Sequence, residues 1–361
     1  MMQRRKNRRV ASRPSFTLVE LVIVLAIITI LASALLFALF GVAEDAKATR
    51  TRAQIAKLHE LVMLKHQAYR TRAVRLGIPP STTNNAATLA AARLLALRDL
   101  MRMELPDRIT DLASSPVTIN VPRQNGSGFH TTRLGPPALW RNYRKRAGFP
   151  RWPMPGGAPT WTTDYQGAEC LYMIVATLRD GDSSGLDFFE ETEIDDVDSD
   201  GMSEIVDGWG NPIMFFRWAP GFATTPGPDG GWGVAGTDDD SNGVPDDLFE
   251  MGWPGSDDAS ELQSRDAEAS PDPFDALQVD GQNYALIPLI YSAGPDRIYD
   301  LSDAVTPPLI YTAPTPPNLP NDPYTPIPAP ALLVGRPQSG GGPSDEFNSL
   351  DNITNHLIAT D

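Results

Sequence analysis

The residues best suited to chemistry are carboxylates placed at alternate positions around glycines in the second half of the chain. Calcium prefers about six to eight hard oxygen ligands, which a loop can supply from positions one, three, five and twelve. Three stretches approach this spacing. Their candidate ligands are Asp180, Asp182, Ser184 and Glu191, then Asp196, Asp198, Asp200 and Asp207, and then Asp238, Asp240, Asn242 and Asp246. We expect at least one of these loops to bind calcium as an isolated structural site. The alternative is that all three are solvated acidic loops.

Other site chemistries have less support in the sequence. The Gly-Lys-Ser/Thr and His-Glu-x-x-His patterns are both missing. The single Cys170 excludes an intramolecular disulfide and a multi-thiolate metal centre, and we expect it to fill space in the core. We therefore expect no catalytic residues and no enzymatic activity. A membrane-anchored enzyme stays open as an alternative.

The net charge of −15 averages two unlike halves of the 361 residues. Residues 1–151 hold 25 Lys and Arg against 8 Asp and Glu, whereas residues 152–361 hold 5 against 37. Such a division indicates different surroundings for the two ends, such as a membrane face and a cation-rich exterior. The basic residues fit a solvated helix face, and no nucleic-acid-binding module follows them, so we do not expect nucleic acid as a partner.

An apolar run near the N-terminus contains one unexpected carboxylate. Residues 21–40 carry no charge and, at about 1.5 Å per residue, span about 30 Å, the thickness of a bilayer core. The basic leader before them would stay cytoplasmic. Glu20 lies just inside the apolar run and should have a partner there, unless it sits at the interface and contacts water.

The residues around this carboxylate resemble a known family. Ser15-Phe16-Thr17-Leu18-Val19-Glu20 followed by an apolar helix resembles the signal of type IV prepilins and type II secretion pseudopilins, although the family usually has Gly where this chain has Ser15. The resemblance implies cleavage between Ser15 and Phe16 by prepilin peptidase and N-methylation of Phe16. It also implies that Glu20 pairs with the amine of a neighbouring subunit during assembly. A secretory signal cleaved near Ala32-Ser33-Ala34 and an uncleaved anchor are the alternatives.

Three later segments resemble the major pseudopilin of type II secretion. They are Asp207-Gly-Trp-Gly-Asn-Pro212, Ser292-Ala-Gly-Pro-Asp296 and Asp351-Asn-Ile-Thr-Asn355. In that family the loop joining the last two elements binds calcium, which implies Ser292, Asp296 and Asp351 as ligands here. A Pro-rich insert at 307–343 lengthens this loop, and Asn352 replaces the family's second Asp.

The elements that must position these residues follow from periodicity and from glycine and proline. Apolar residues spaced by three and four predict an amphipathic helix whose stripe includes Ile55, Leu58, Leu64 and Ala68. Helices are expected at 86–104 and 137–148, and strands at 213–218 and 284–291, the second at an edge or bulged because of Pro288. Residues 168–178 are ambiguous between helix and strand.

Together these patterns predict an α+β protein in three parts. Residues 1–15 are the leader, 16–75 form one membrane and assembly helix, and 76–361 form the head, an antiparallel sheet with long acidic and Pro-rich loops packed on that helix. We expect a single-pass inner-membrane precursor with a periplasmic head. It would assemble with other pilin-like subunits, through an inner-membrane platform, into a pseudopilus or an extracellular fibre. An adhesive or DNA-uptake pilin is the binding-module alternative.

Overall fold

The structure is a computed structural model that describes eleven stretches of the chain. These are residues 17–151, 161–239, 243–247, 250–253, 255–281, 283–299, 301–302, 310–312, 323–324, 334–336 and 352–358. The predicted leader, Ser15 and Phe16, and most of the Pro-rich insert lie outside them. The α+β class is confirmed, since a long N-terminal helix is combined with small, mainly antiparallel sheets.

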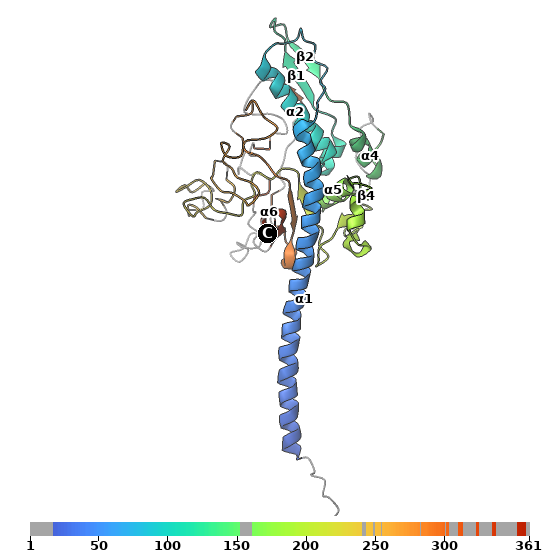
Figure 1. Ribbon diagram of the computed structural model, residues 1–361, viewed down its shortest axis with the longest axis vertical. Helices are drawn as coiled ribbons and strands as arrows, with labels where there is room; N and C mark the ends of the chain where they lie inside the picture. Colours follow the sequence, from blue (N-terminus) through green and yellow to red (C-terminus); the bar gives the residue numbers. More distant parts are fainter. Residues whose placement is uncertain are drawn as a thin grey trace, which may run out of the picture. The chain divides into compact units, whose positions relative to one another are not determined.

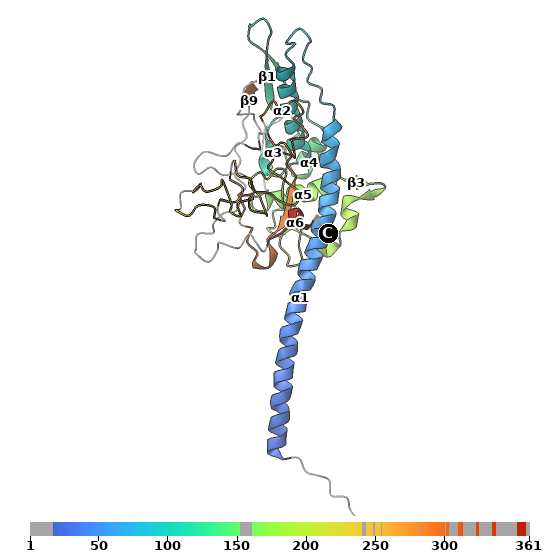
Figure 2. The ribbon, with the colours of Figure 1, turned by 60° about the vertical axis from the view of Figure 1, so that its left-hand side comes forward.

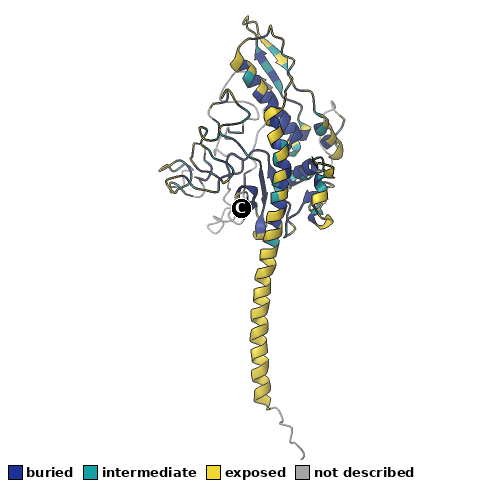
Figure 3. Cartoon of the chain, in the orientation of Figure 1, coloured by how far each residue is buried: buried dark blue, intermediate teal, exposed yellow. Residues whose placement is uncertain are grey.

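The chain begins with the long helix α1 (Leu18–Ala68), which continues into the 3-10 turn η1 (Tyr69–Thr71). The prediction extended this helix to residue 75, but Arg72 already has an extended backbone. Two compact units divide between Ala46 and Lys47, inside α1. In the first unit, residues 17–46 are exposed throughout (Figure 3). This part of α1 is long and apolar enough to cross a membrane.

In the second unit, α1 buries one stripe of side chains in the head. The buried residues are Thr51, Gln54, Ile55, Leu58, Leu61, Val62 and His66. Leu64 and Ala68, which the prediction included in this stripe, are exposed, Leu64 by 58%. His66 continues the buried row of Leu58 and Val62 at a spacing of four residues, whereas Leu64 and Ala68 are exposed on another face of the helix.

The described residues of the second unit include five further helices. They are α2 (Ala86–Glu104), α3 (Ile109–Ala113), α4 (Ala138–Arg146), α5 (Gln166–Val175) and α6 (Asn355–Ile358). Asn85 caps α2, because its side-chain oxygen accepts hydrogen bonds from the backbone of Ala87 and Thr88. The ambiguous segment at 168–178 is mostly helix, and its Cys170 is fully buried, as expected.

Two three-stranded sheets make up most of the β-structure. The first has the order β2–β1–β9, from β1 (Thr118–Pro122), β2 (Phe129–Thr132) and β9 (Ile310–Thr312). Its β1–β9 pair is parallel, so the sheets are not purely antiparallel as predicted. Helix α2 packs along β1, and the two lie side by side in both views (Figures 1 and 2). Strand β9 falls within the predicted Pro-rich insert, so that insert contributes to the sheet.

The second sheet is antiparallel and has the order β10–β8–β7. It consists of β7 (Met214–Phe216), β8 (Leu289–Ser292) and β10 (Ile353–Thr354). Strand β8 is therefore central, whereas the prediction made it an edge or bulged strand. Pro288, which has no N–H to donate, lies just before the first paired residue of β8, so it removes no hydrogen bond from the sheet. The carbonyl of Pro288 instead accepts a hydrogen bond from the side chain of Asn355 at 2.9 Å.

Two short hairpins and three 3-10 turns carry the acidic loops. The hairpins are β3 (Arg179–Asp180) with β4 (Ser183–Ser184) and β5 (Ile194–Asp195) with β6 (Glu204–Ile205). The turns are η2 (Gly185–Phe188), η3 (Glu191–Glu193) and η5 (Gly294–Asp296). Helix α5 packs against both β6 and β7, so it links the second hairpin to the second sheet.

Candidate functional site

The start of α1 gives Glu20 a partner in its own chain. Thr17 precedes the helix and donates hydrogen bonds to one carboxylate oxygen of Glu20 from its backbone N–H and its hydroxyl, each at 2.9 Å. The backbone N–H of Glu20 donates back to the Thr17 hydroxyl at 3.2 Å. This reciprocal arrangement is a capping box, which satisfies donors that a helix start leaves open. Ser15 and Phe16, the residues of the predicted cleavage, lie outside the described part of the chain.

The turn after β6 is organised by one buried carboxylate. Asp207 accepts hydrogen bonds from the backbone N–H groups of Trp209 and Asn211, at 2.8 and 2.9 Å, and from the Asn211 side chain at 3.2 Å. The Ser292 hydroxyl donates to the same carboxylate at 2.6 Å. Gly210 has a φ of +84°, a conformation that favours glycine. The spacing of the acidic loop placed Asp207 at its twelfth position, but in the structure this carboxylate organises the turn instead.

This turn also holds the head against α1. The backbone N–H of Gly208 donates to the Thr51 hydroxyl at 3.0 Å, and the Gln54 side chain donates to the Val206 carbonyl at 3.1 Å. A Cβ on Gly208 would stand 2.7 Å from the carbonyl oxygen of Lys47. The glycine is therefore required by the close approach of two backbones. The Asp207–Pro212 segment, singled out from the sequence by resemblance, is one of the places where the head contacts the long helix.

The structure brings the three family-like segments together at the second sheet. Asn211 donates to the Gly294 carbonyl at 3.0 Å, which joins the first segment to the second. Asn355, in the third, accepts from the backbone N–H of Ile290 at 2.8 Å. Of the calcium ligands that the resemblance implies, Ser292 is fully buried and its hydroxyl bonds to Asp207. Asp296 is exposed and accepts from the backbone N–H of Ile298. Asp351 lies outside the described residues.

The first predicted calcium loop begins with the β3–β4 hairpin. Asp180 pairs with Ser183 across it, and Asp182 is exposed near the turn. The backbone N–H of Ser184 donates to Asp187, while Glu191 begins η3 and is exposed. Among the residues that the structure describes here, Asp182 and Glu191 do not fall in a group of three metal-ligand side chains. The side chain of Asp180 is not among those described.

The third predicted calcium loop is described only in part, since Asp240 and Asn242 lie outside the described residues. Asp238 accepts a hydrogen bond from the backbone N–H of Gly243 at 2.8 Å. Asp246 accepts one from Gly236 at 2.7 Å. Each of these carboxylates therefore has a backbone partner in the loop.

The second predicted calcium loop is the one in which the carboxylates converge. The loop closes the β5–β6 hairpin and turns back on itself, so that the N–H groups of Asp200 and Gly201 both donate to Asp196, at 3.1 Å each. Ser199 and Gly201 have φ values of 62° and 94°, which make this compact turn. Asp196 and Asp198 form a group with Glu204 in which the ligand oxygens lie within 4.8 Å of one another.

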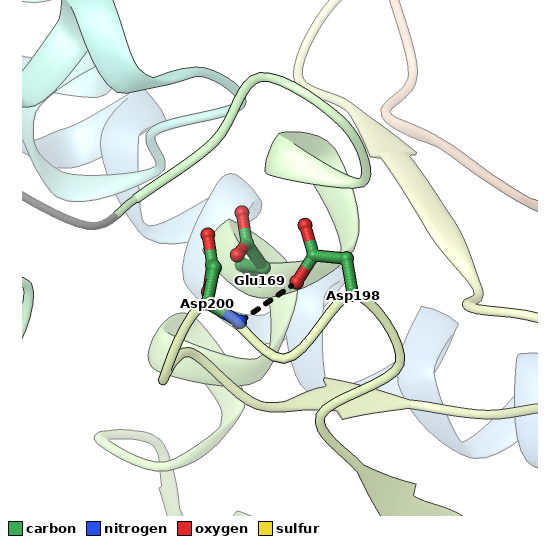
Figure 4. Close-up of side chains that lie close together, drawn as sticks. All are labelled: Glu169, Asp198 and Asp200. Atoms are coloured by element: carbon green, nitrogen blue, oxygen red, sulfur yellow. Dashed lines mark hydrogen bonds between the residues drawn. The ribbon is translucent and has the colours of Figure 1, made fainter.

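A second group comes from outside the loop. Asp198 and Asp200 lie within the same 4.8 Å limit of Glu169, which projects from α5 (Figure 4). The Trp161 indole N–H donates to one oxygen of Glu169. The Thr162 hydroxyl donates to Asp198 at 2.6 Å, and its backbone N–H donates to Asp200 at 2.6 Å. Three segments distant in sequence therefore meet around the loop.

Two members of these groups are buried and have unused oxygens. Glu169 is 1% exposed and Glu204 is fully buried, and the Oε1 atom of each has no hydrogen-bond partner. Burial, followed by the charges of nearby loop aspartates, raises the pKa of Glu169 to about 9 and that of Glu204 to about 7. A buried carboxylate oxygen with no donor is costly, so each of these atoms needs a partner such as a proton, a water molecule or a cation.

Sequence reasoning missed both glutamates. Glu204 occupies the ninth position of the loop, which was not considered as a ligand. Glu169 is remote in sequence from Asp196, and the signal that could have found it is a lone carboxylate in the apolar segment 168–178. Asp207 is not in these groups, because strand β6 (Glu204–Ile205) leads the chain out of the loop and into the next turn before Asp207 is reached.

One family model matches the chain in comparisons with known proteins. It describes the prokaryotic N-terminal methylation motif and covers residues 13–36, which include Ser15, Phe16 and Glu20. No curated protein and no solved structure matches the chain. The chain therefore has a prepilin-type N-terminal methylation motif followed by a long apolar helix, a combination consistent with a type IV pilin-like protein.

Proposed function

We propose that this protein is a structural subunit of a pilin-like fibre, made as a prepilin and assembled through the N-terminal part of α1. The observation that carries the proposal is the methylation motif at residues 13–36, which coincides with the start of a helix able to span a membrane. On this proposal prepilin peptidase cleaves after Ser15, and the new amine of Phe16 is methylated. The precursor crosses the inner membrane once, with the leader cytoplasmic and the head periplasmic.

Among pilin-like fibres we propose a pseudopilus of the type II secretion kind. The support is the resemblance of three segments to the major pseudopilin, together with their convergence on one sheet through the Asp207–Ser292 and Asn211–Gly294 hydrogen bonds. A fibre subunit of this kind would contact other pilin-like subunits and an inner-membrane assembly platform. The secretion test below would distinguish a pseudopilus from an adhesive or DNA-uptake fibre.

The proposal is tested first at the N-terminus. The full chain is expressed with a prepilin peptidase, and the mature protein is analysed by mass spectrometry. We expect it to begin with N-methylated Phe16, and a terminus at Met1 or near Ala34 would contradict the proposal. Replacement of Ser15 by Glu should block cleavage, whereas Ser15→Gly should be processed at least as well as the wild type.

Assembly is tested next in the source cells. Glu20→Ala should leave membrane insertion and cleavage intact but prevent fibre formation. The matched control is Glu60→Ala, which removes an exposed carboxylate from the same helix and should assemble normally. Deletion of the gene should abolish secretion of a folded periplasmic enzyme if the fibre is a pseudopilus. Unimpaired secretion with lost adhesion or DNA uptake would instead favour the other class of fibre.

A further inference from the structure

We propose that Asp196, Asp198, Asp200, Glu204 and Glu169 bind one calcium ion. The site differs from the loop predicted from spacing alone, since it exchanges Asp207 for two glutamates. It is independent of the fibre proposal, because it lies wholly in the second compact unit and needs neither cleavage nor assembly.

The first argument is the geometry of the oxygens. Asp198 belongs to both groups of carboxylates, so a cation held by Asp198 can reach Asp196 and Glu204 on one side and Glu169 and Asp200 on the other. Oxygens on opposite sides of a calcium ion stand about 4.8 Å apart, since each lies about 2.4 Å from it. The oxygens of each group lie within this limit of one another, so either group can contact one calcium ion, and the shared Asp198 would bring the two groups to the same ion.

The second argument is the two buried oxygens without donors. Exposed aspartates in a loop need no cation, because water solvates them. Glu169 and Glu204 are buried, each has an unpartnered Oε1 atom, and each belongs to a group of carboxylates that includes two loop aspartates. The donor described for Glu169 is the neutral indole of Trp161, which does not balance the charge of this cluster. A divalent cation would supply both the charge and the missing contact.

The chemistry of the ligands favours calcium over other cations. All five side chains are carboxylates, which exclude a preference for zinc or copper, since these ions favour nitrogen and sulfur. Five carboxylates can offer more than six oxygens in irregular positions, which calcium accepts. Magnesium requires near-octahedral geometry and keeps most of its water.

The site would join three parts of the head. The loop between β5 and β6 supplies four ligands counting Glu204, and α5 supplies Glu169. The segment at Trp161 and Thr162 is held to the same carboxylates by hydrogen bonds. Because α5 also packs on β7, calcium would fix the acidic hairpin to the second sheet.

Calcium binding is measured on the detergent-solubilised full chain by equilibrium dialysis and calorimetry with calcium chloride, and again with magnesium chloride. We expect Asp198→Asn and Glu169→Gln each to weaken one calcium-binding event by about tenfold or more, since affinity depends on ligand charge. The matched control is Asp164→Asn, which removes an exposed carboxylate near Thr162 and should bind as the wild type does. Wild-type affinity and stoichiometry in both ligand variants would overturn the proposal, as would tighter binding of magnesium than of calcium.

Thermal unfolding separates a ligand from a merely structural residue. In chelator, Asp198→Asn and Glu169→Gln should melt at or above the wild-type temperature, because Asn and Gln fill the same space and carry no charge into the acidic cluster. In excess calcium the order should reverse, since calcium stabilises the wild type more. Variants that melt below the wild type by equal amounts in both conditions would overturn the proposal. Terbium emission sensitised by tryptophan should also fall in Trp161→Phe, while unchanged emission in that variant would place the bound ion elsewhere.

Discussion

The hydroxyl of Ser292 donates a 2.6 Å hydrogen bond to the carboxylate of Asp207, and this contact joins the end of β8 to the turn that rests on α1. Both residues are buried, Ser292 completely. The same carboxylate accepts three more hydrogen bonds within its own turn. Asp207 is thus a structural centre through which the second sheet and the long helix are held in one arrangement.

Removal of either partner should therefore destabilise the head. We expect Ser292→Ala to lower the free energy of unfolding by about 2 kcal/mol, since a hydrogen bond to a charged group is lost in a buried place. Asp207→Ala should cost more, because four donors lose their acceptor. The measurement is denaturant unfolding of the full chain in detergent, with the exposed Ser183→Ala as control. If Asp207→Ala instead weakened calcium binding and left stability in chelator unchanged, Asp207 would be a ligand after all.

Because the turn packs closely against α1, a methyl group added at Gly208 should destabilise the head. Gly208→Ala would bring a Cβ to 2.7 Å from the Lys47 carbonyl oxygen and 2.9 Å from its Cα. We expect a loss of about 1–3 kcal/mol in stability, the usual cost of overpacking. Gly135→Ala is the control, since nothing lies within 4 Å of that position. Equal melting temperatures for the two variants would mean that the backbones do not pack this closely.

The sequence predicted the helical part of this fold better than the acidic half, for a physical reason. Helix α2 was expected at 86–104 and has these bounds, because Asn85 caps it and Pro106 stops it locally. The role of Pro288 could not be predicted from the local sequence, because its carbonyl accepts a hydrogen bond from Asn355, which is remote in sequence. The parallel β1–β9 pair is likewise set by tertiary contacts within a segment that composition marks as irregular.

The sequence likewise predicted some of the candidate metal ligands and missed others. The loop aspartates follow from local spacing, and three of the four predicted in the second loop do converge. Asp207 was assigned to a ligand position because it is the twelfth residue of the loop, whereas here strand β6 carries it away from the other carboxylates. Glu169 reaches the loop only through the packing of α5, so a linear pattern could not place it.

The capping box at the start of α1 predicts a difference between two substitutions of Glu20. Gln can replace Glu in a capping box but cannot form an ion pair. Glu20→Gln should therefore keep the helix start and membrane insertion while losing fibre assembly, if assembly depends on the charge. Thr17→Val removes the hydroxyl that contacts Glu20 and leaves the charge, so it should assemble. Fibres of normal yield from Glu20→Gln would show that capping, and not ion pairing, is what Glu20 contributes.

Two buried histidines each make a contribution to stability that is lost in mild acid. Burial, with Arg70 nearby, lowers the pKa of His66 to about 4, and burial lowers that of His356 to about 4, from an ordinary value of 6.5. Below pH 6.5 these two histidines become protonated in the unfolded chain but stay neutral in the folded head, so the contribution of each to stability falls as the pH drops from about 6.5 to about 4. Each histidine should contribute a loss of about 3 kcal/mol over this interval.

The variant His66→Leu isolates one of these contributions. His66 packs edge-on against Phe274, with ring centroids 5.3 Å apart, and Leu is a comparable apolar filler. Glu169 and Glu204, whose raised pKa values act in the opposite sense, are common to both proteins and cancel in the comparison. Unfolding of the full chain is followed in detergent and chelator at several values of pH. We expect the variant to gain stability on the wild type steadily from pH 6.5 to pH 4.5, and parallel curves would mean that His66 is protonated in the folded head.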